Sequence, residues 1–164
     1  MTELAGVAPS SMRSVYAEDL SVGRTYQLDS YRVTEAEIVE FASRWDPQFF
    51  HLDAEDARNG YFGGLIASGI QTTAIFSRLT ALACFQHWNI VAGKGFRDLR
   101  FLCPVRPGDV LAGSLVIDRV VFRGDRPATV LSHGNLWNQD GREVFTVVAE
   151  FVVDTCQGVR PRMR

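Results

Sequence analysis

The feature that most constrains this sequence is its central segment, residues 61–85, whose second half is apolar almost all round. That pattern predicts a helix that starts at Ser68–Gly69 and is buried on most sides. A membrane span is excluded, because residues 62–85 also contain three glycines and Arg78. A chain with such a helix must cover it with other elements of the same domain.

The rest of the chain supplies strands for that cover. One strand-like segment, 24–33, precedes the helix. Four segments rich in Val, Phe, Leu and Ile follow it: 95–102, 110–122, 128–137 and 143–153. The pair Asp140-Gly141 predicts a hairpin turn between the segments 128–137 and 143–153. The order of one strand, then helices, then antiparallel strands is α+β. Because one nearly all-apolar helix needs a curved sheet wrapped around it, we expect the hotdog fold.

A second feature is the stretch RWDPQFFHLDAEDA, residues 44–57. Thr34 and Glu37 form a capping-box pattern that starts a helix, and this helix should end near Asp46. Asp46 and His51 are then close together among aromatic residues, which is costly if they are buried without partners. They are either part of a solvated turn after a helix or an acid/base pair in an apolar pocket.

Length and composition limit the classes of function. The chain has 164 residues, which predicts one domain, residues 15–154, between an N-terminal arm at 1–14 and a basic tail at 155–164. The net charge of −2 gives no electrostatic basis for binding nucleic acid. No membrane association is expected either.

The cysteine pattern and the N-terminus indicate the compartment. The three cysteines are Cys84, Cys103 and Cys156, an odd number without close pairs, which favours reduced thiols. The N-terminus lacks a basic run followed by an apolar region, so no signal peptide is predicted. We expect a cytoplasmic protein. His87 follows Cys84 by three residues, but no further ligands at metal-site spacing accompany them, so no metal site is expected.

Three stretches together resemble a known family. WDPQFFHLD, YFGGLIASG and RFLCPVRPGDVL closely resemble the MaoC-like dehydratases, which are grouped with the (R)-specific enoyl-CoA hydratases of the hotdog superfamily. The resemblance covers residues 16–153. In the family's loop motif, Asp46 and His51 match the aspartate and histidine, while Gln48 replaces an asparagine and Phe49 a proline.

The resemblance implies roles for individual residues. Asp46 and His51 would be the catalytic pair, and the backbone N–H of Gly69 would polarise the thioester carbonyl. Ser68 is either a hydrogen-bonding partner of the pair or a helix cap. The aromatic neighbours would line an acyl pocket; these are Phe49, Phe50 and Phe62.

The implied reaction is the reversible addition of water to a trans-2-enoyl-CoA, which gives a (R)-3-hydroxyacyl-CoA. In this reaction Asp46 and His51 activate one water and shuttle its proton. No cofactor is expected, since coenzyme A is part of the substrate. We expect a homodimer or a higher even oligomer, because a single curved sheet leaves strand edges open.

Two alternatives stay open. One is a hotdog acyl-CoA thioesterase, although residues 70–85 contain no Asp or Glu of the kind such enzymes place on the central helix. The other is a non-catalytic acyl-binding or partner subunit. Outside the motifs, His133 is interpreted as structural. Arg97, Arg100 and Arg126 fit coenzyme A phosphates and surface salt bridges equally well.

Overall fold

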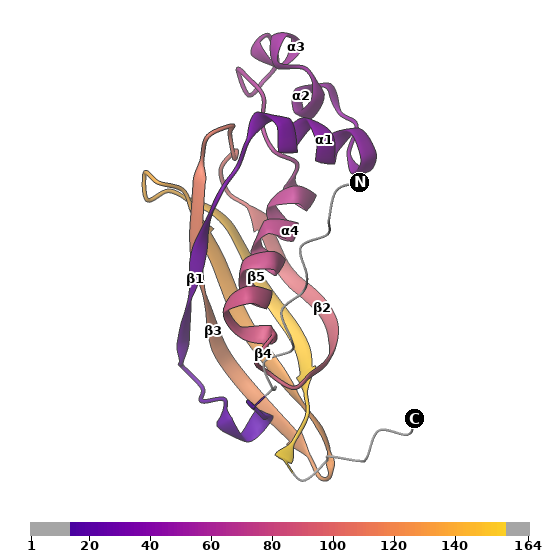
Figure 1. The fold of residues 1–164 in the computed structure, drawn as a ribbon, viewed down its shortest axis with the longest axis vertical. Coiled ribbons are helices and arrows are strands. Elements are labelled where there is room, and N and C mark those ends of the chain that lie inside the picture. Colours follow the sequence, from indigo (N-terminus) through magenta and orange to yellow (C-terminus); the bar gives the residue numbers. More distant parts are fainter. Residues whose placement is uncertain (1–13, 157–164) are drawn as a thin grey trace, which may run out of the picture.

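The computed structural model describes residues 14–156. It has one antiparallel sheet of five strands in the order β1-β3-β4-β5-β2, which curves around the helix α4 (Figure 1). This confirms the predicted α+β class and the wrapped central helix. The strands are β1 (Thr25–Arg32), β2 (Ile90–Phe101), β3 (Val110–Arg123), β4 (Arg126–Trp137) and β5 (Glu143–Val153). The helices are η1 (Ala17–Asp19), α1 (Glu35–Trp45), α2 (Phe49–Leu52), α3 (Ala54–Arg58), α4 (Gly69–Thr80) and η2 (Ala81–Phe85).

The first helix begins where its capping box predicts. The Glu37 amide donates to the Thr34 hydroxyl at 3.2 Å, and the Thr34 amide donates to the Glu37 carboxylate at 3.0 Å. Two otherwise unpaired donors of the first turn are thereby satisfied. Helix α1 ends at Trp45, so Asp46 is its C-terminal cap residue. Local signals alone therefore place Asp46 at the end of a helix.

The central helix differs from the prediction in how it ends. Its α-helical part ends at Thr80 and continues as the π-helical turn η2, rather than running as one α-helix to Phe85. The wider turn leaves Cys84 buried and Leu82 exposed. One side of α4 is uncovered in the single chain, since Ile70 is 59% exposed, which agrees with a helix predicted to be buried on most of its sides.

The contact between α4 and the sheet depends on one glycine of β4. Phe76 is buried on α4, and a Cβ at Gly134 would overlap its ring. The absence of a side chain at Gly134 therefore lets helix and strand approach closely. Burial alternates along β4, with Val130, Ser132 and Leu136 among its buried residues. This regular alternation is harder to read in the sequence, where polar residues occupy some of the inward positions.

Strand β2 forms one edge of the sheet and is exposed along most of its length. Its exposed apolar side chains include Val91 and Phe96. Within residues 14–156 no helix has the length and hydropathy needed to cross a bilayer. The predicted arm at 1–14 and tail at 155–164 lie almost entirely outside the described residues, so these boundaries stay predictions.

Candidate active site

Asp46 accepts hydrogen bonds from two directions at the C-terminus of α1. The Ser68 hydroxyl donates to Asp46 Oδ2 at 2.6 Å, and the Gln48 side-chain amide donates to Asp46 Oδ1 at 2.8 Å. These bonds, that from Ser68 first, hold the pKa of Asp46 below its usual range. Asp46 is therefore an ionised carboxylate at neutral pH.

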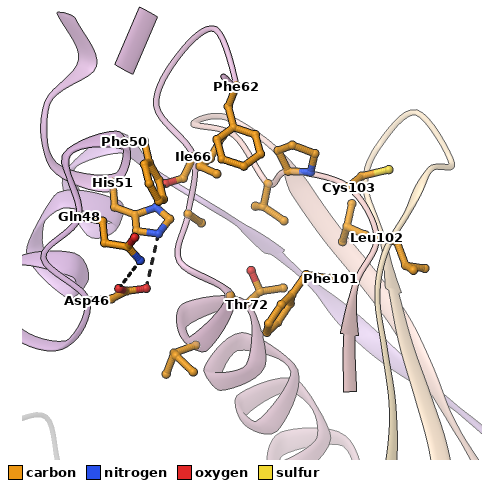
Figure 2. Close-up of a pocket in the computed structure, with 16 residues that line it drawn as sticks. Asp46, Gln48, Phe50, His51, Phe62, Ile66, Thr72, Phe101, Leu102 and Cys103 are labelled. Carbon is orange, nitrogen blue, oxygen red and sulfur yellow. Dashed lines mark hydrogen bonds and ion pairs between the residues drawn. The ribbon is translucent and has the colours of Figure 1, made fainter. Parts of the chain in front are cut away.

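His51 belongs to the four-residue helix α2, an element that the sequence does not predict. Its Nδ1 lies 2.7 Å from the carbonyl oxygen of Ile66 (Figure 2). A carbonyl oxygen only accepts, so Nδ1 must carry a proton and donate. Nε2, the other ring nitrogen, lies 3.4 Å from Asp46 Oδ2. The His51 ring is buried, and its Nε2 faces the Asp46 carboxylate.

Ser68 joins the pair to the start of α4. Its oxygen accepts from the Ile70 amide at 3.1 Å while its hydroxyl donates to Asp46. Ser68 is thus both a helix cap and a partner of the carboxylate, which combines the two roles left open by the sequence. Gly69 follows at the first helical position, where an amide has no acceptor within the helix. The positive end of the helix dipole lies at the same place.

A cavity of about 470 Å³ lies beside the pair and the start of α4. Asp46, His51 and Gly69 all line it, as do Phe50 and Phe62. The cavity therefore brings together the three backbone and side-chain groups that the sequence assigns to the chemistry. Its volume falls within the range of small-molecule sites, and its apolar walls with few polar groups are typical of them.

Phe49 is the predicted pocket residue that the structure places elsewhere. Its ring lies against Phe50 and near Gly60, it is 52% exposed, and it is not part of the cavity wall. Adjacent residues of a helix point in different directions, so Phe49 and Phe50 cannot both face the cavity. The expectation that Phe49 lines the pocket was wrong.

Residues 101–105 form a further wall of the cavity that sequence reasoning did not assign. They begin at Phe101, the last residue of β2, and the amide of Ala67 donates to the carbonyl of Val105 at 2.8 Å. Figure 2 shows Phe101 beside Thr72 at the first turn of α4. The stretch RFLCPVRPGDVL was the available signal, because it is one of the three stretches that carry the resemblance.

Metal ligands are not gathered in the described part of the chain. Within residues 14–156 no group of three His, Cys, Asp or Glu side chains is placed to hold a metal ion. Cys84, Cys103 and Cys156 are free thiols. The groups that do meet at the site are a carboxylate, an imidazole and helix-terminal amides. This set can hold and deprotonate a water beside a carbonyl.

Comparisons with known proteins identify the family of this chain. The family model described as "MaoC like domain" matches residues 18–130. Among solved structures, the MaoC-like dehydratase from Rhodospirillum rubrum is similar at a TM-score of 0.79 and 35% identity, over 90% of this chain and 99% of that one. The (R)-hydratase PhaJ1 from Pseudomonas aeruginosa is similar at 0.73 and 26% identity, over 88% of each chain.

A curated relative, the uncharacterized protein YdeM of Bacillus subtilis, is 38% identical over 94 residues, which are 57% of this chain and 67% of the relative. Taken with the hotdog architecture, the match of the family model over most of the chain settles its membership. The chain belongs to the MaoC-like domain family.

Proposed function

We propose that this protein catalyses the reversible addition of water to a trans-2-enoyl thioester, giving a (R)-3-hydroxyacyl thioester. The observation that carries the proposal is the set of Asp46, His51 and the Gly69 amide around one cavity. Family membership supports the hydro-lyase class, and coenzyme A is the proposed carrier of the acyl group.

The geometry suggests how the water is held. His51 Nδ1 donates to Ile66, so the neutral ring has a lone pair at Nε2, and Asp46 is ionised. A lone pair 3.4 Å from a carboxylate oxygen cannot bond to it directly, since both are acceptors. A water can donate one hydrogen to each. We infer that the substrate water binds there, between two bases.

The proposed reaction then balances without a redox step. The water loses a proton to Asp46 or His51 as its oxygen bonds to the β-carbon of the enoyl group. The electrons of the double bond move toward the thioester oxygen, which accepts a hydrogen bond from the Gly69 amide. The α-carbon then takes a proton from the pair.

We further propose that no redox cofactor takes part, because the reaction neither oxidises nor reduces the substrate. We also propose that no metal is needed, because the Gly69 amide would polarise the carbonyl and the Asp46–His51 pair would move the proton. Association through the exposed edge strand β2 is proposed as well. Val91 and Phe96 are exposed there at 56% and 52%, and an uncovered edge is a pairing surface. We place the reaction in the cytoplasm, where free thiols persist.

The test is a pair of assays on one reaction mixture. Purified protein is mixed with crotonyl-CoA, the loss of enoyl absorbance is followed, and the release of coenzyme A is measured with a thiol reagent. Hydration predicts loss of absorbance without a free thiol, and a chiral separation of the product should give the (R)-3-hydroxy form. A free thiol would instead indicate a thioesterase. Binding with neither change would indicate an acyl-binding subunit.

A further inference from the structure

A second cavity lies further along the groove that contains the proposed active site. The two cavities have volumes of about 470 and 370 Å³. Thr72 lines the first, and Phe76 and Thr80 line the second. These positions are four residues apart and share one face of α4, so the groove extends about 12 Å from Thr72 to Thr80.

The same two strands border both cavities. In the antiparallel pairing of β2 and β5, Phe101 is opposite Phe145, whereas Phe96 is opposite Ala149. Phe101 lines the first cavity, and Phe96 and Ala149 line the second. Helix and sheet thus agree that the cavities are consecutive sections of one groove between α4 and the β2–β5 edge.

Three aromatic rings separate the sections. The Phe76 and Phe145 ring centroids are 5.3 Å apart, and those of Phe101 and Phe145 are 6.0 Å apart. Phe101 stands on the side of the first cavity, Phe76 on the side of the second, and the fully buried Phe145 lies between them. We call these three residues the aromatic partition.

Two glycines hold the partition in place. A Cβ at Gly69 would lie 2.5 Å from Phe101 Cε2, and a Cβ at Gly134 would overlap the Phe76 ring. Each ring therefore rests directly against backbone. Phe101 in particular lies beside the first residue of α4, where the thioester carbonyl would be polarised, so an acyl chain that leaves the carbonyl along the groove meets the partition at once.

The second cavity has the character of an acyl-chain site. Its walls include the apolar residues Phe85, Leu115 and Phe151. At its mouth, Lys94 pairs with Glu150 at 2.5 Å. Thr80 is almost completely buried, and its hydroxyl oxygen has no hydrogen-bond partner among the described residues. An unpaired buried hydroxyl is costly in a packed core, and this one belongs to a residue of the cavity wall.

We propose that the aromatic partition, through Phe101 and Phe76, sets the acyl-chain length of this enzyme by confining the chain to the first cavity. Short enoyl thioesters fit before the partition, and longer chains reach the second cavity only when a ring is removed. Rejection by a wall of aromatic rings is a steric form of specificity, since longer chains lose affinity instead of gaining it from added apolar contact. This inference rests on the proposed function.

The test compares chain lengths in matched variants. Crotonyl-CoA and trans-2-dodecenoyl-CoA are supplied to the wild type, Phe101→Ala and Phe76→Leu, and kcat/KM is measured for each. The wild type should favour the short substrate. In either variant the ratio of kcat/KM for the long substrate to kcat/KM for the short one should rise by at least about 10-fold. This is the lower end of the effect of one methylene group in an apolar pocket. Phe76→Leu retains most of the buried apolar volume, and thermal melts verify folding.

The control is Phe122→Ala. Phe122 and Phe101 are equally exposed, at 50%, but Phe122 lies on β3 away from both cavities, so its removal should leave the ratio unchanged. Calorimetric titration with butanoyl-CoA and dodecanoyl-CoA gives a readout that needs no turnover. If no enoyl-CoA is hydrated but the affinity ratio shifts as described, the proposed function fails and the partition stands. Three results would overturn the partition. The ratio of long to short ligand could be unshifted in both folded variants, the wild type could accept both chain lengths equally, or neither ligand could bind.

Discussion

Two aspartate–histidine pairs of residues 14–156 can be compared, Asp46–His51 beside the start of α4 and Asp118–His133 on the sheet. On the sheet, His133 Nδ1 lies 2.6 Å from Asp118 Oδ1, whereas His51 Nε2 lies 3.4 Å from Asp46 Oδ2. The closer pair is the more exposed one. The side chains of His133 and Asp118 are 51% and 38% exposed, against 4% and 23% for His51 and Asp46.

The difference shows that a short distance is not what makes such a pair useful for catalysis. A direct contact in water satisfies both groups and contributes little free energy. Asp46 and His51 each have other partners that orient them, and a cavity opens beside them. Their wider separation leaves both acceptors available to a third molecule. Orientation by neighbours, low exposure and access to a cavity distinguish the proposed catalytic pair.

The largest effect is expected from removing the buried pair. Asp46→Asn retains shape without the base, and His51→Gln retains a hydrogen-bonding group without the proton shuttle. Each should lower kcat for enoyl-CoA hydration by about 10²-fold or more. The double variant should be little worse than the worse single one, because groups acting on one water are not additive. Retention of most of the wild-type rate by both single variants would refute the assignment.

Replacing Gly69 should have the next largest effect. Gly69→Val puts a side chain where the thioester oxygen approaches the amide, and kcat/KM should fall by about 10²-fold, similar to the loss of one oxyanion donor. The side chain would also meet the Phe101 ring. The double variant Gly69→Val/Phe101→Ala separates the two causes by relieving the ring contact. Full recovery of kcat/KM in the double variant would mean that the glycine serves only to admit the ring.

This contact also illustrates how far the sequence alone leads. The capping box of Thr34 and Glu37 is a local signal, and it correctly places Asp46 at the end of α1. The approach of Phe101 to Gly69 depends on the register of β2 against β5, which involves residues far apart in the chain. No local pattern encodes it. The sequence thus indicates one reason for glycine at 69, the approach of the thioester oxygen to its amide. The structure adds a second reason, the close approach of the Phe101 ring.

The short helix α2 and the π-helical turn η2 were missed for a related reason. Four residues from Phe49 to Leu52 are too few to show a helical period. In η2, residues 81–85 are apolar in any helical register, so their composition does not reveal the wider turn. Elements with clear periodicity or turn residues were predictable, whereas those defined by tertiary packing were not.

A smaller effect, on pH dependence, is expected from Ser68→Ala. The hydrogen bond from Ser68 is the main cause of the low pKa of Asp46, so its loss should raise that pKa. Asp46 would then become protonated at higher pH, and the acid limb of the kcat/KM profile should shift upward in pH. The same carboxylate stabilises the fold above its unfolded pKa of about 3.9, and this contribution is lost as the pH falls through the lower folded pKa.

The control for Ser68 is Ser43→Ala. Ser43 lies on α1, exposed, and its hydroxyl donates to the carbonyl of Glu40 at 2.8 Å. Removal of the Ser43 hydroxyl should leave the acid limb of the kcat/KM profile at the same pH. A profile that does not move in Ser68→Ala, measured under conditions where the variant is folded, would show that this hydroxyl does not tune the carboxylate.

The smallest effect is expected from the exposed pair. His133→Gln and Asp118→Asn remove a contact of 2.6 Å, and proximity alone would rank this pair as the stronger candidate. Because both side chains are exposed to water, each variant should retain wild-type kcat and KM and lose at most about 1 kcal/mol of unfolding free energy. His133→Gln is thus the matched control for His51→Gln, with the same substitution at the other histidine of an aspartate–histidine pair. Hydration kinetics and chemical denaturation of the two variants measure both quantities. If either variant lost turnover as severely as His51→Gln, catalysis would depend on the sheet surface, and burial beside a cavity would no longer separate the two pairs.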